Sequence, residues 1–323
     1  MTEAGRAAIR QALATAGTAF AVGSLHVPQP FLAVLAAQLT AGIAFSRPGG
    51  FMQRIAGAWA GSLCGMLLLV ALPEQYWFSL PLFGVAVGAG TAAFSKFGGA
   101  SAAILFAMGI GGMFSAGIVH PQMGLLAGSA HAASLSIAVA VTWFARSVFS
   151  TTARDCEAPA SYWLTGLTGV VTLITACVTI PAESVVMSIA AMVTSLSLTA
   201  SGGIPQKLAG GVLGAAVSLI FLTIVSGAGN DFAVFLLAMA IVMGGFEWLA
   251  VSHPNNASLI RQAGALFAVA ATILPRPEQF LFASWRRMLA VLIGLAIASL
   301  IHAAFDFEGG KNSTPEGFVP PSR

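Results

Sequence analysis

Two adjacent arginines, Arg286 and Arg287, fall inside a long apolar segment near the end of the chain. They follow the expected outer end of this segment by six or seven residues, a depth of roughly 10 Å. Guanidinium groups at such depth usually face a bundle interior or a wet cavity, and their planar donors suit bidentate binding of a carboxylate. We predict that one of them binds an anion, since adjacent helical positions point about 100° apart and should not serve one cavity. The alternatives are extension to the membrane surface or pairing with Glu278.

Two other ionisable residues lie within apolar segments. His131 is expected at a depth similar to that of the arginines, and histidine can titrate near neutral pH, so it is a candidate for substrate binding or proton coupling. The alternative is a histidine held by hydrogen bonds in a packed helix. Glu247 is a second candidate proton carrier, or instead an interfacial partner for Arg261 or His253.

Arg54 and Lys207 occupy equivalent positions in two similar stretches of sequence. Residues 49–57 read GGFMQRIAG and residues 202–210 read GGIPQKLAG. Each cation stands just after a Gly-Gly pair, where a helix should start, and helix N-termini attract anions. We therefore predict capture of an acidic substrate or of lipid phosphate there, with plain anchoring at the cytoplasmic face as the alternative.

Composition indicates which elements position these residues. The chain is 57% hydrophobic and 8% charged, with a mean hydropathy of +0.89. Such a sequence cannot cover an ordinary water-facing surface, and its apolar runs approach the roughly 20 residues that cross a bilayer as a helix. We predict an all-α polytopic membrane protein with about twelve spans, over residues 7–26, 30–46, 53–72, 77–94, 99–119, 123–149, 161–180, 183–200, 205–226, 231–251, 257–274 and 279–305.

Charge placement predicts the orientation. With twelve spans, 11 of the 14 basic residues fall on the side of the two termini. The positive-inside rule makes this side cytoplasmic. The membrane that we expect is the inner, or plasma, membrane. The outer loops then hold the acidic residues Glu74, Glu183, Asp231 and Glu278. The N-terminal run could also be read as a signal peptide, but its removal would leave the first half without its first helix.

The repeated stretch predicts that the chain is one unit written twice. An even number of spans per half makes the halves parallel, related by a pseudo-two-fold axis along the membrane normal. We expect a first six-helix repeat over residues 1–150, a cytoplasmic linker over 151–160, a second repeat over 161–305 and a disordered cytoplasmic tail over 306–323. Glycines at four-residue spacing in both copies favour close helix packing, with a substrate-facing surface as the alternative; they are Gly57, Gly61 and Gly65, then Gly210 and Gly214.

The repeated helix resembles that of the fusaric acid resistance and aromatic acid exporter superfamily. The residues that carry the resemblance are Gln53, Arg54, Gly57, Gly61 and Gly65, then Gln206, Lys207, Gly210 and Gly214. It implies proton-driven export of aromatic carboxylates, often beside a periplasmic adaptor protein, whereas related six-helix modules form anion channels. This chain departs from the longer exporters, because its linker and tail leave no room for their cytoplasmic domain.

These patterns lead us to expect a secondary inner-membrane exporter of small organic anions, with a passive anion channel as the alternative. We expect no enzyme activity, no cofactor and no nucleic-acid partner; a homo-oligomer is compatible with the pattern. The sequence GGK at residues 309–311 lacks the spacing of a phosphate-binding loop. Cys64, Cys156 and Cys177 lack the spacing of a metal site, so no bound metal is expected.

Overall fold

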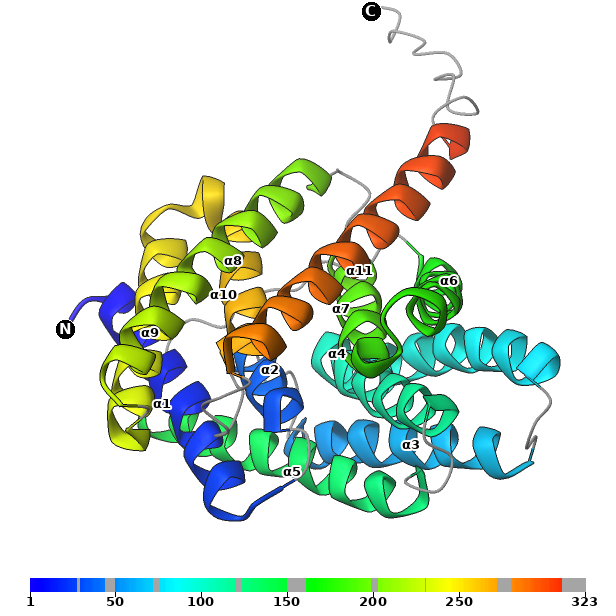
Figure 1. Cartoon of the computed structure of the whole chain (residues 1–323), viewed down its shortest axis with the longest axis horizontal. Helices are drawn as coiled ribbons and strands as arrows, with labels where there is room; N and C mark the ends of the chain where they lie inside the picture. Colours follow the sequence, from blue (N-terminus) through cyan, green and yellow to red (C-terminus); the bar gives the residue numbers. More distant parts are fainter. Residues whose placement is uncertain are drawn as a thin grey trace, which may run out of the picture.

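The computed structural model describes residues 1–27, 30–43, 50–71, 76–119, 124–149, 161–198, 203–229, 231–271 and 280–309. Its α-helices are α1 (Glu3–Ser24), α2 (Pro30–Thr40), α3 (Gly50–Ala71), α4 (Tyr76–Val119), α5 (Gly124–Val148), α6 (Tyr162–Thr179), α7 (Ser184–Ser197), α8 (Ile204–Gly227), α9 (Phe232–Ser252), α10 (Ala257–Ala271) and α11 (Phe280–Gly309). Two 3₁₀ turns, η2 (Pro181–Glu183) and η3 (Pro254–Asn256), precede α7 and α10. No strand occurs in these ranges, which confirms the all-α prediction (Figure 1).

Helix α4 is two helical segments joined at Gly99. That residue has φ 76° and ψ −176°, a conformation that glycine adopts without steric cost. Divided there, the described chain has an α-helical segment within or overlapping each expected range, while the number of membrane spans stays a prediction. Six helices in the described ranges are long and apolar enough to cross a membrane, so the chain is a multi-pass helical membrane protein.

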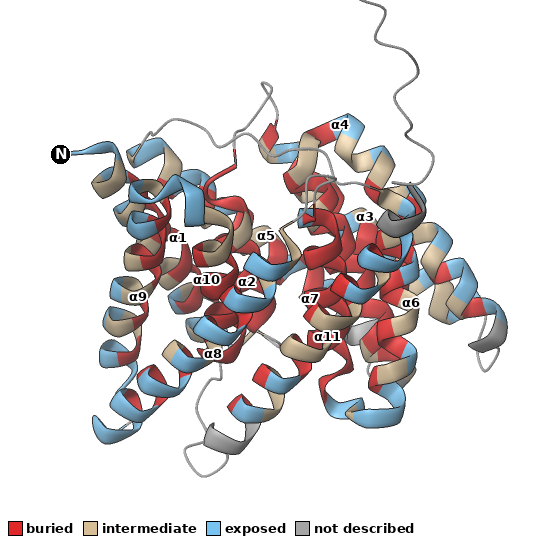
Figure 2. Cartoon of the chain, turned by 90° about the horizontal axis from the view of Figure 1, so that it is seen from above, coloured by how far each residue is buried: buried red, intermediate tan, exposed pale blue. Residues whose placement is uncertain are grey.

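Two helices are shorter than expected and lie in the core. Helix α2 has 11 residues and α7 has 14, which gives lengths of about 16 and 21 Å against the roughly 30 Å of bilayer hydrocarbon. Every residue of α7 from Ser184 to Leu196 is buried, and so is nearly all of α2. Figure 2 shows buried residues concentrated on these central helices, with exposed residues on the outer ones. Hydropathy did not reveal this, because apolar residues face protein and lipid alike.

The glycines of α3 lie against the second segment of α4. A Cβ atom on Gly57 would lie 2.6 Å from the carbonyl oxygen of Ala102, and one on Gly61 would overlap the carbonyl oxygen of Phe106. No side chain fits between two backbones this close. The packing interpretation of this stripe is confirmed.

The equivalent glycines of α8 make the equivalent contact with α10. Cβ atoms on Gly210 and Gly214 would overlap the carbonyl oxygens of Leu259 and Ala263. The copy of the repeated stretch in the second half of the chain therefore also packs through its glycines. The same backbone-to-backbone arrangement occurs at both places.

A second kind of contact links the first and second halves of the sequence. In α9, a Cβ atom on Gly244 would lie 3.1 Å from the carbonyl oxygen of Ala8 in α1. In α4, one on Gly88 would lie 2.7 Å from the ring of Trp163 in α6. Helices α1 and α9 run side by side, although they are far apart in sequence (Figure 1). The first helix of each half therefore packs on a helix of the other half.

The ends of the expected domains are partly outside the described residues. The expected linker, 151–160, lies wholly outside them, and so does the expected tail from residue 310 onward. Helix α11 itself is assigned through Gly309. The expected tail therefore stays a prediction.

Candidate functional site

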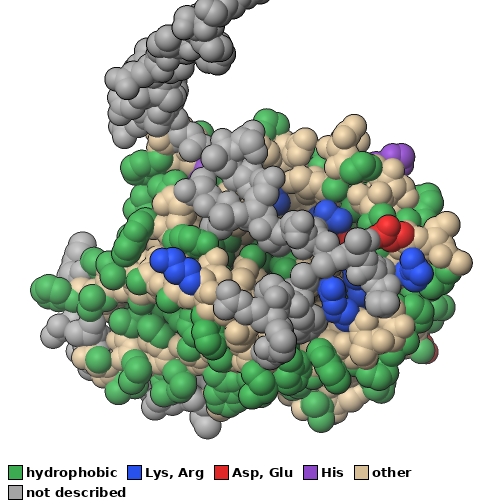
Figure 3. All heavy atoms as spheres, turned by 180° about the vertical axis from the view of Figure 1, so that it is seen from behind, with side chains coloured by type: hydrophobic (Ala, Val, Ile, Leu, Met, Phe, Trp, Pro, Cys, Tyr) green, Lys and Arg blue, Asp and Glu red, His purple; other side chains and the backbone are tan. Residues whose placement is uncertain are grey.

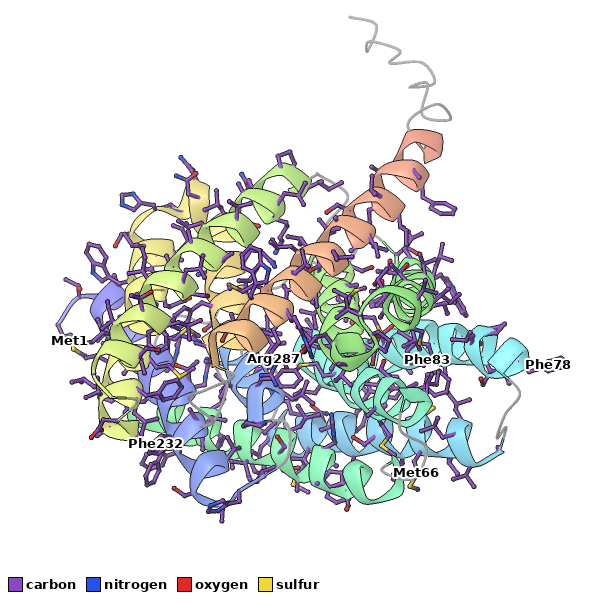
Figure 4. All side chains as sticks on the ribbon, viewed as in Figure 1. Met1, Met66, Phe78, Phe83, Phe232 and Arg287 are labelled. Carbon is purple, nitrogen blue, oxygen red and sulfur yellow. The ribbon has the colours of Figure 1, made fainter. Side chains whose placement is uncertain are left out.

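The two adjacent arginines of α11 meet one buried carboxylate. Arg286 Nη2 lies 3.1 Å from Glu183 Oε1, and Arg287 Nε lies 3.6 Å from Glu183 Oε2. Figure 4 shows Arg287 in the middle of the bundle. Our expectation that adjacent positions would not serve one cavity is wrong, because both long side chains bend toward a point between them. The partner we considered, Glu278, lies outside the described residues.

Glu183 is not the exposed loop residue that the sequence suggested. It ends the η2 turn and is only 6% exposed. Pro181 starts this turn, and the Glu183 backbone N–H donates to the Ile180 carbonyl at 3.0 Å. Glu183 is also the N-cap residue of α7, yet its side chain makes no capping hydrogen bond. Its two oxygens point to the arginines, beside the positive end of the α7 dipole.

A third element, α2, completes the cluster. The Arg287 guanidinium carbon lies 4.9 Å from the centroid of the Phe31 ring, a cation–π distance. Phe31 is 3% exposed and is the second residue of α2, directly after Pro30. The site therefore joins α2 from the first half of the sequence to η2, α7 and α11 from the second half.

The chemistry of this cluster suits a carboxylate ligand. Its three ionisable members, Glu183, Arg286 and Arg287, carry two positive charges and one negative charge. The side chains of Arg286 and Arg287 are 37% and 22% exposed, so both keep some surface that Glu183 does not cover. Each guanidinium has five N–H donors in a planar fork, which allows it to bind carboxylates in pairs of hydrogen bonds.

His131 lies on α5, where its ring covers a glycine. It is 1% exposed, and a Cβ atom on Gly112 of α4 would lie 2.5 Å from its Nε2 atom. The side chain of Ile189 on α7 lies at the same place. His131 lies seven residues after Gly124, the first residue of α5. Its surroundings are those of a packed side chain, and its role in substrate binding or proton coupling stays a prediction.

Arg54 is directed at the backbone of α2. It is 1% exposed, and its Nη2 atom donates to the Ile43 carbonyl at 2.9 Å. Its Nη1 atom lies 3.5 Å from the Thr40 carbonyl, and Arg146 Nη1 also donates to Ile43 at 3.2 Å. Cations at this end of a helix satisfy the last carbonyls and the negative end of the dipole. Lys207, the equivalent of Arg54, is only half-buried at the start of α8, so the two matched positions differ.

Glu247 forms a balanced ion pair with Arg261. Arg261 Nε and Nη2 lie 3.3 Å from Glu247 Oε2 and Oε1, so the pair is bidentate. The Glu247 side chain is 5% exposed and that of Arg261 is 26% exposed. This pairing between α9 and α10 is one of the two interpretations the sequence allowed for Glu247. Figure 3 shows a face of the molecule on which Lys and Arg side chains gather beside an acidic side chain.

One buried polar network escaped the sequence analysis. Ser195 Oγ of α7 lies 2.8 Å from His302 Nε2 of α11 and 3.1 Å from Thr165 Oγ1 of α6. All three residues are at most 1% exposed. Between this network and the Glu183 cluster, a Cβ atom on Gly294 would lie 2.6 Å from the Met187 carbonyl oxygen. Helix α11 therefore contacts α7, or the η2 turn before it, at three places along its length: the ion pairs with Glu183, the close approach at Gly294 and the hydrogen bond of His302.

Neither metal ligands nor known relatives point to another site. Within the described ranges, no three His, Cys, Asp or Glu side chains are grouped so that they could hold a metal ion. Comparisons of the chain with models of known protein families, with curated proteins and with solved structures gave no match. The cluster of Glu183, Arg286 and Arg287 is therefore the feature of the described residues from which a function can be inferred.

Proposed function

We propose that the protein is a secondary transporter that exports small organic anions, such as aromatic carboxylates, across the inner membrane and is coupled to protons. The observation that carries this proposal is the pair of arginines around Glu183 in the interior of a multi-pass helical membrane protein. Ionisable side chains in such a setting are costly and usually belong to a substrate or ion pathway. Two guanidiniums select for an anion.

The doubled helix contacts support an arrangement as two parallel six-helix repeats with twelve spans. Helix α3 packs on α4 through glycines as α8 packs on α10, and α1 packs on α9 as α6 packs on α4. A two-fold axis that exchanges the halves would generate this pattern. In this arrangement α2 and α7 are equivalent buried helices. Phe31 on α2 and Glu183 before α7 then place the cluster between the halves, where repeat-built transporters bind their substrates.

The start of α7 adds to the affinity for anions. Helix N-termini within discontinuous segments of transporters point at anionic groups of the substrate, because their N–H groups and dipole carry positive potential. The 14-residue helix α7 begins at Ser184, immediately after Glu183. A carboxylate bound by Arg286 and Arg287 would therefore also lie close to this positive helix end.

Efflux of radiolabelled 4-hydroxybenzoate from cells with and without the protein tests the proposal. We expect faster efflux with the protein, and loss of this gain when Arg286 and Arg287 are both replaced by alanine. Lys96→Ala is the matched control, because Lys96 is an exposed cation of α4 away from the cluster. Equal efflux with and without the protein, for this and other aromatic carboxylates, would reject the function.

The passive channel remains a defined outcome of the same experiment. An uncoupler collapses the pH gradient. The flux through a carrier coupled to protons then changes, whereas the flux through a passive anion channel does not require that gradient. Flux that ignores the uncoupler, together with single-channel currents in planar bilayers, would replace the carrier by an anion channel with the same site.

A further inference from the structure

We propose that Glu183 is a tethered competitor of the transported anion. Its carboxylate occupies Arg286 and Arg287 while the site is empty, and it is displaced and protonated when a substrate carboxylate binds. This inference rests on the proposed anion site and adds to it a residue that sets affinity and couples binding to a proton.

The geometry is that of a bound ligand. Each oxygen of Glu183 meets a different arginine, at 3.1 Å for Arg286 and 3.6 Å for Arg287. A dissolved carboxylate would use the same donors in the same way, because the chemical group is identical. The substrate and Glu183 therefore cannot both hold these two donor atoms.

Glu183 is placed to leave without moving a helix. It is the last residue of a one-turn 3₁₀ segment, and its side chain does not cap α7. Among the described residues, the ion-pair contacts of this side chain are those with the two arginines, and rotation about its side-chain bonds breaks them. The backbone contacts of α7 with α11, such as that at Gly294, can stay in place during this exchange.

Displacement favours the neutral form of Glu183. Its side chain is only 8% exposed, so a carboxylate that has lost its arginine donors stays largely desolvated. The substrate carboxylate next to it adds repulsion between like charges. Both effects disfavour the charged form of a carboxyl group. A proton from water then joins a Glu183 oxygen, while the substrate anion takes over the two arginines.

Among the described residues, the charged groups that face Glu183 come from α11. The elements packed against η2 and the start of α7 are α4, α6 and α11, and α7 itself has no charged residue. Other ionisable side chains of these elements are engaged elsewhere or exposed: Tyr162 bonds to Ser95 at 2.6 Å, His302 bonds to Ser195, and Lys96 is exposed. Cys177 of α6 is exposed and lines an apolar groove with Pro181. Within the described part of the chain, the two arginines are therefore the charged groups in contact with Glu183.

This exchange fixes the sign of the coupling. Each bound anion brings one proton with it, so affinity rises as pH falls, and anion and proton cross the membrane together. Export is then driven by the outward concentration gradient of the acid. Exchange of incoming protons for outgoing anions would require the opposite linkage, in which protonation weakens anion binding.

Calorimetric titration of the purified protein with benzoate tests the role of Glu183. At pH values where benzoate is ionised, we expect wild-type affinity to fall as pH rises, with about one proton taken up per benzoate. Glu183→Gln keeps the shape but removes the charge, so it should bind benzoate about tenfold more tightly, with little pH dependence and no proton uptake. Glu247→Gln is the matched control, since it neutralises the other buried acid of the described ranges, and it should bind benzoate as the wild type does.

Each result bears on a distinct statement. If benzoate binds to the wild type and binding is lost on replacing both arginines, but Glu183→Gln has unchanged affinity and pH dependence, the tethered competitor is wrong and the anion site stands. If the wild type binds neither benzoate nor other aromatic carboxylates, the proposed function fails and the role of Glu183 fails with it. Should Glu183→Gln not fold, proton uptake by the wild type decides: one proton per benzoate supports the proposal, and none overturns it.

Discussion

Glu183 and Glu247 are both nearly buried acids paired with arginine, yet their sites are built differently. Glu247 and Arg261 form a bidentate one-to-one pair between two helices of the second half, α9 and α10. Glu183 meets two arginines and lies where α2, α7 and α11 come together. The first arrangement pairs one guanidinium with one carboxylate, while the second directs two guanidiniums at one carboxylate. Burial of an ion pair alone therefore does not indicate function; an unequal number of opposite charges at a junction of the two halves does.

The largest effect should follow the loss of Arg287. It contacts both Glu183 and Phe31, whereas Arg286 contacts Glu183 and is more exposed. We expect Arg287→Ala to lower 4-hydroxybenzoate transport about 100-fold, which corresponds to about 2.7 kcal/mol of lost binding energy. Arg286→Ala should lower it by about tenfold.

Transport by equal amounts of reconstituted protein checks this order. Arg287→Lys is an informative companion, because it keeps the charge but not the planar fork, and it should recover only part of the activity. Full activity of both alanine variants would show that the cluster resembles the Glu247 pair in function, and the contrast between the two sites would disappear.

At the other site the expected loss is in stability. Arg261→Ala leaves the carboxylate of Glu247 buried without its bidentate partner. Removing one member of a fully buried pair costs about 3–5 kcal/mol, and we expect about 2 kcal/mol here, because Arg261 is partly exposed. Unfolding in detergent should measure this loss, while transport per folded molecule should equal that of the wild type. A stable variant with impaired transport would move Glu247 and Arg261 into the transport pathway.

A smaller effect should follow from Phe31→Leu. This change removes the ring under Arg287 and with it a cation–π interaction of about 1 kcal/mol, so benzoate should bind about fivefold more weakly. Phe83→Leu is a suitable control, because Phe83 is equally buried and stacks on Phe114 at 4.5 Å, away from the cluster. Both variants should lose some stability. If both also weakened benzoate binding to the same extent, the effect would be one of general packing.

The sequence predicted the elements better than the site. Apolar runs of about 20 residues predicted where the helices of the described ranges lie, and the glycine spacing predicted the packing of α3 and α8, because both signals are local. The burial of α2 and α7 was not predictable, since hydropathy is the same for residues that face lipid and residues that face protein.

Glu183 shows why the site itself was missed. Pro181 interrupts the apolar run, so the residues around it read as an outer loop, and nothing local indicates that this turn is buried. Its partners, Arg286 and Arg287, are about a hundred positions away, and only the fold brings them together. The pair of Glu247 and Arg261 was foreseen because both residues lie near one short connection, where a contact requires little knowledge of the fold.

The smallest expected effect is the sharpest test of the contrast. Replacing Glu247 and Arg261 together by leucine removes the charges in equal number, so no uncompensated charge is left. Exchanges of buried ion pairs for apolar residues are often neutral or stabilising, and we expect a change in the free energy of unfolding below about 1 kcal/mol. In a double-mutant cycle, most of the loss from Arg261→Leu alone should be recovered. Transport should be unchanged, because the pair contributes no donor to the substrate.

Replacing Glu183 and Arg287 together by leucine should instead abolish transport even where stability is kept, because the substrate needs Arg287 after Glu183 has left. Equal outcomes for the two double variants would mean that the extra arginine makes no difference.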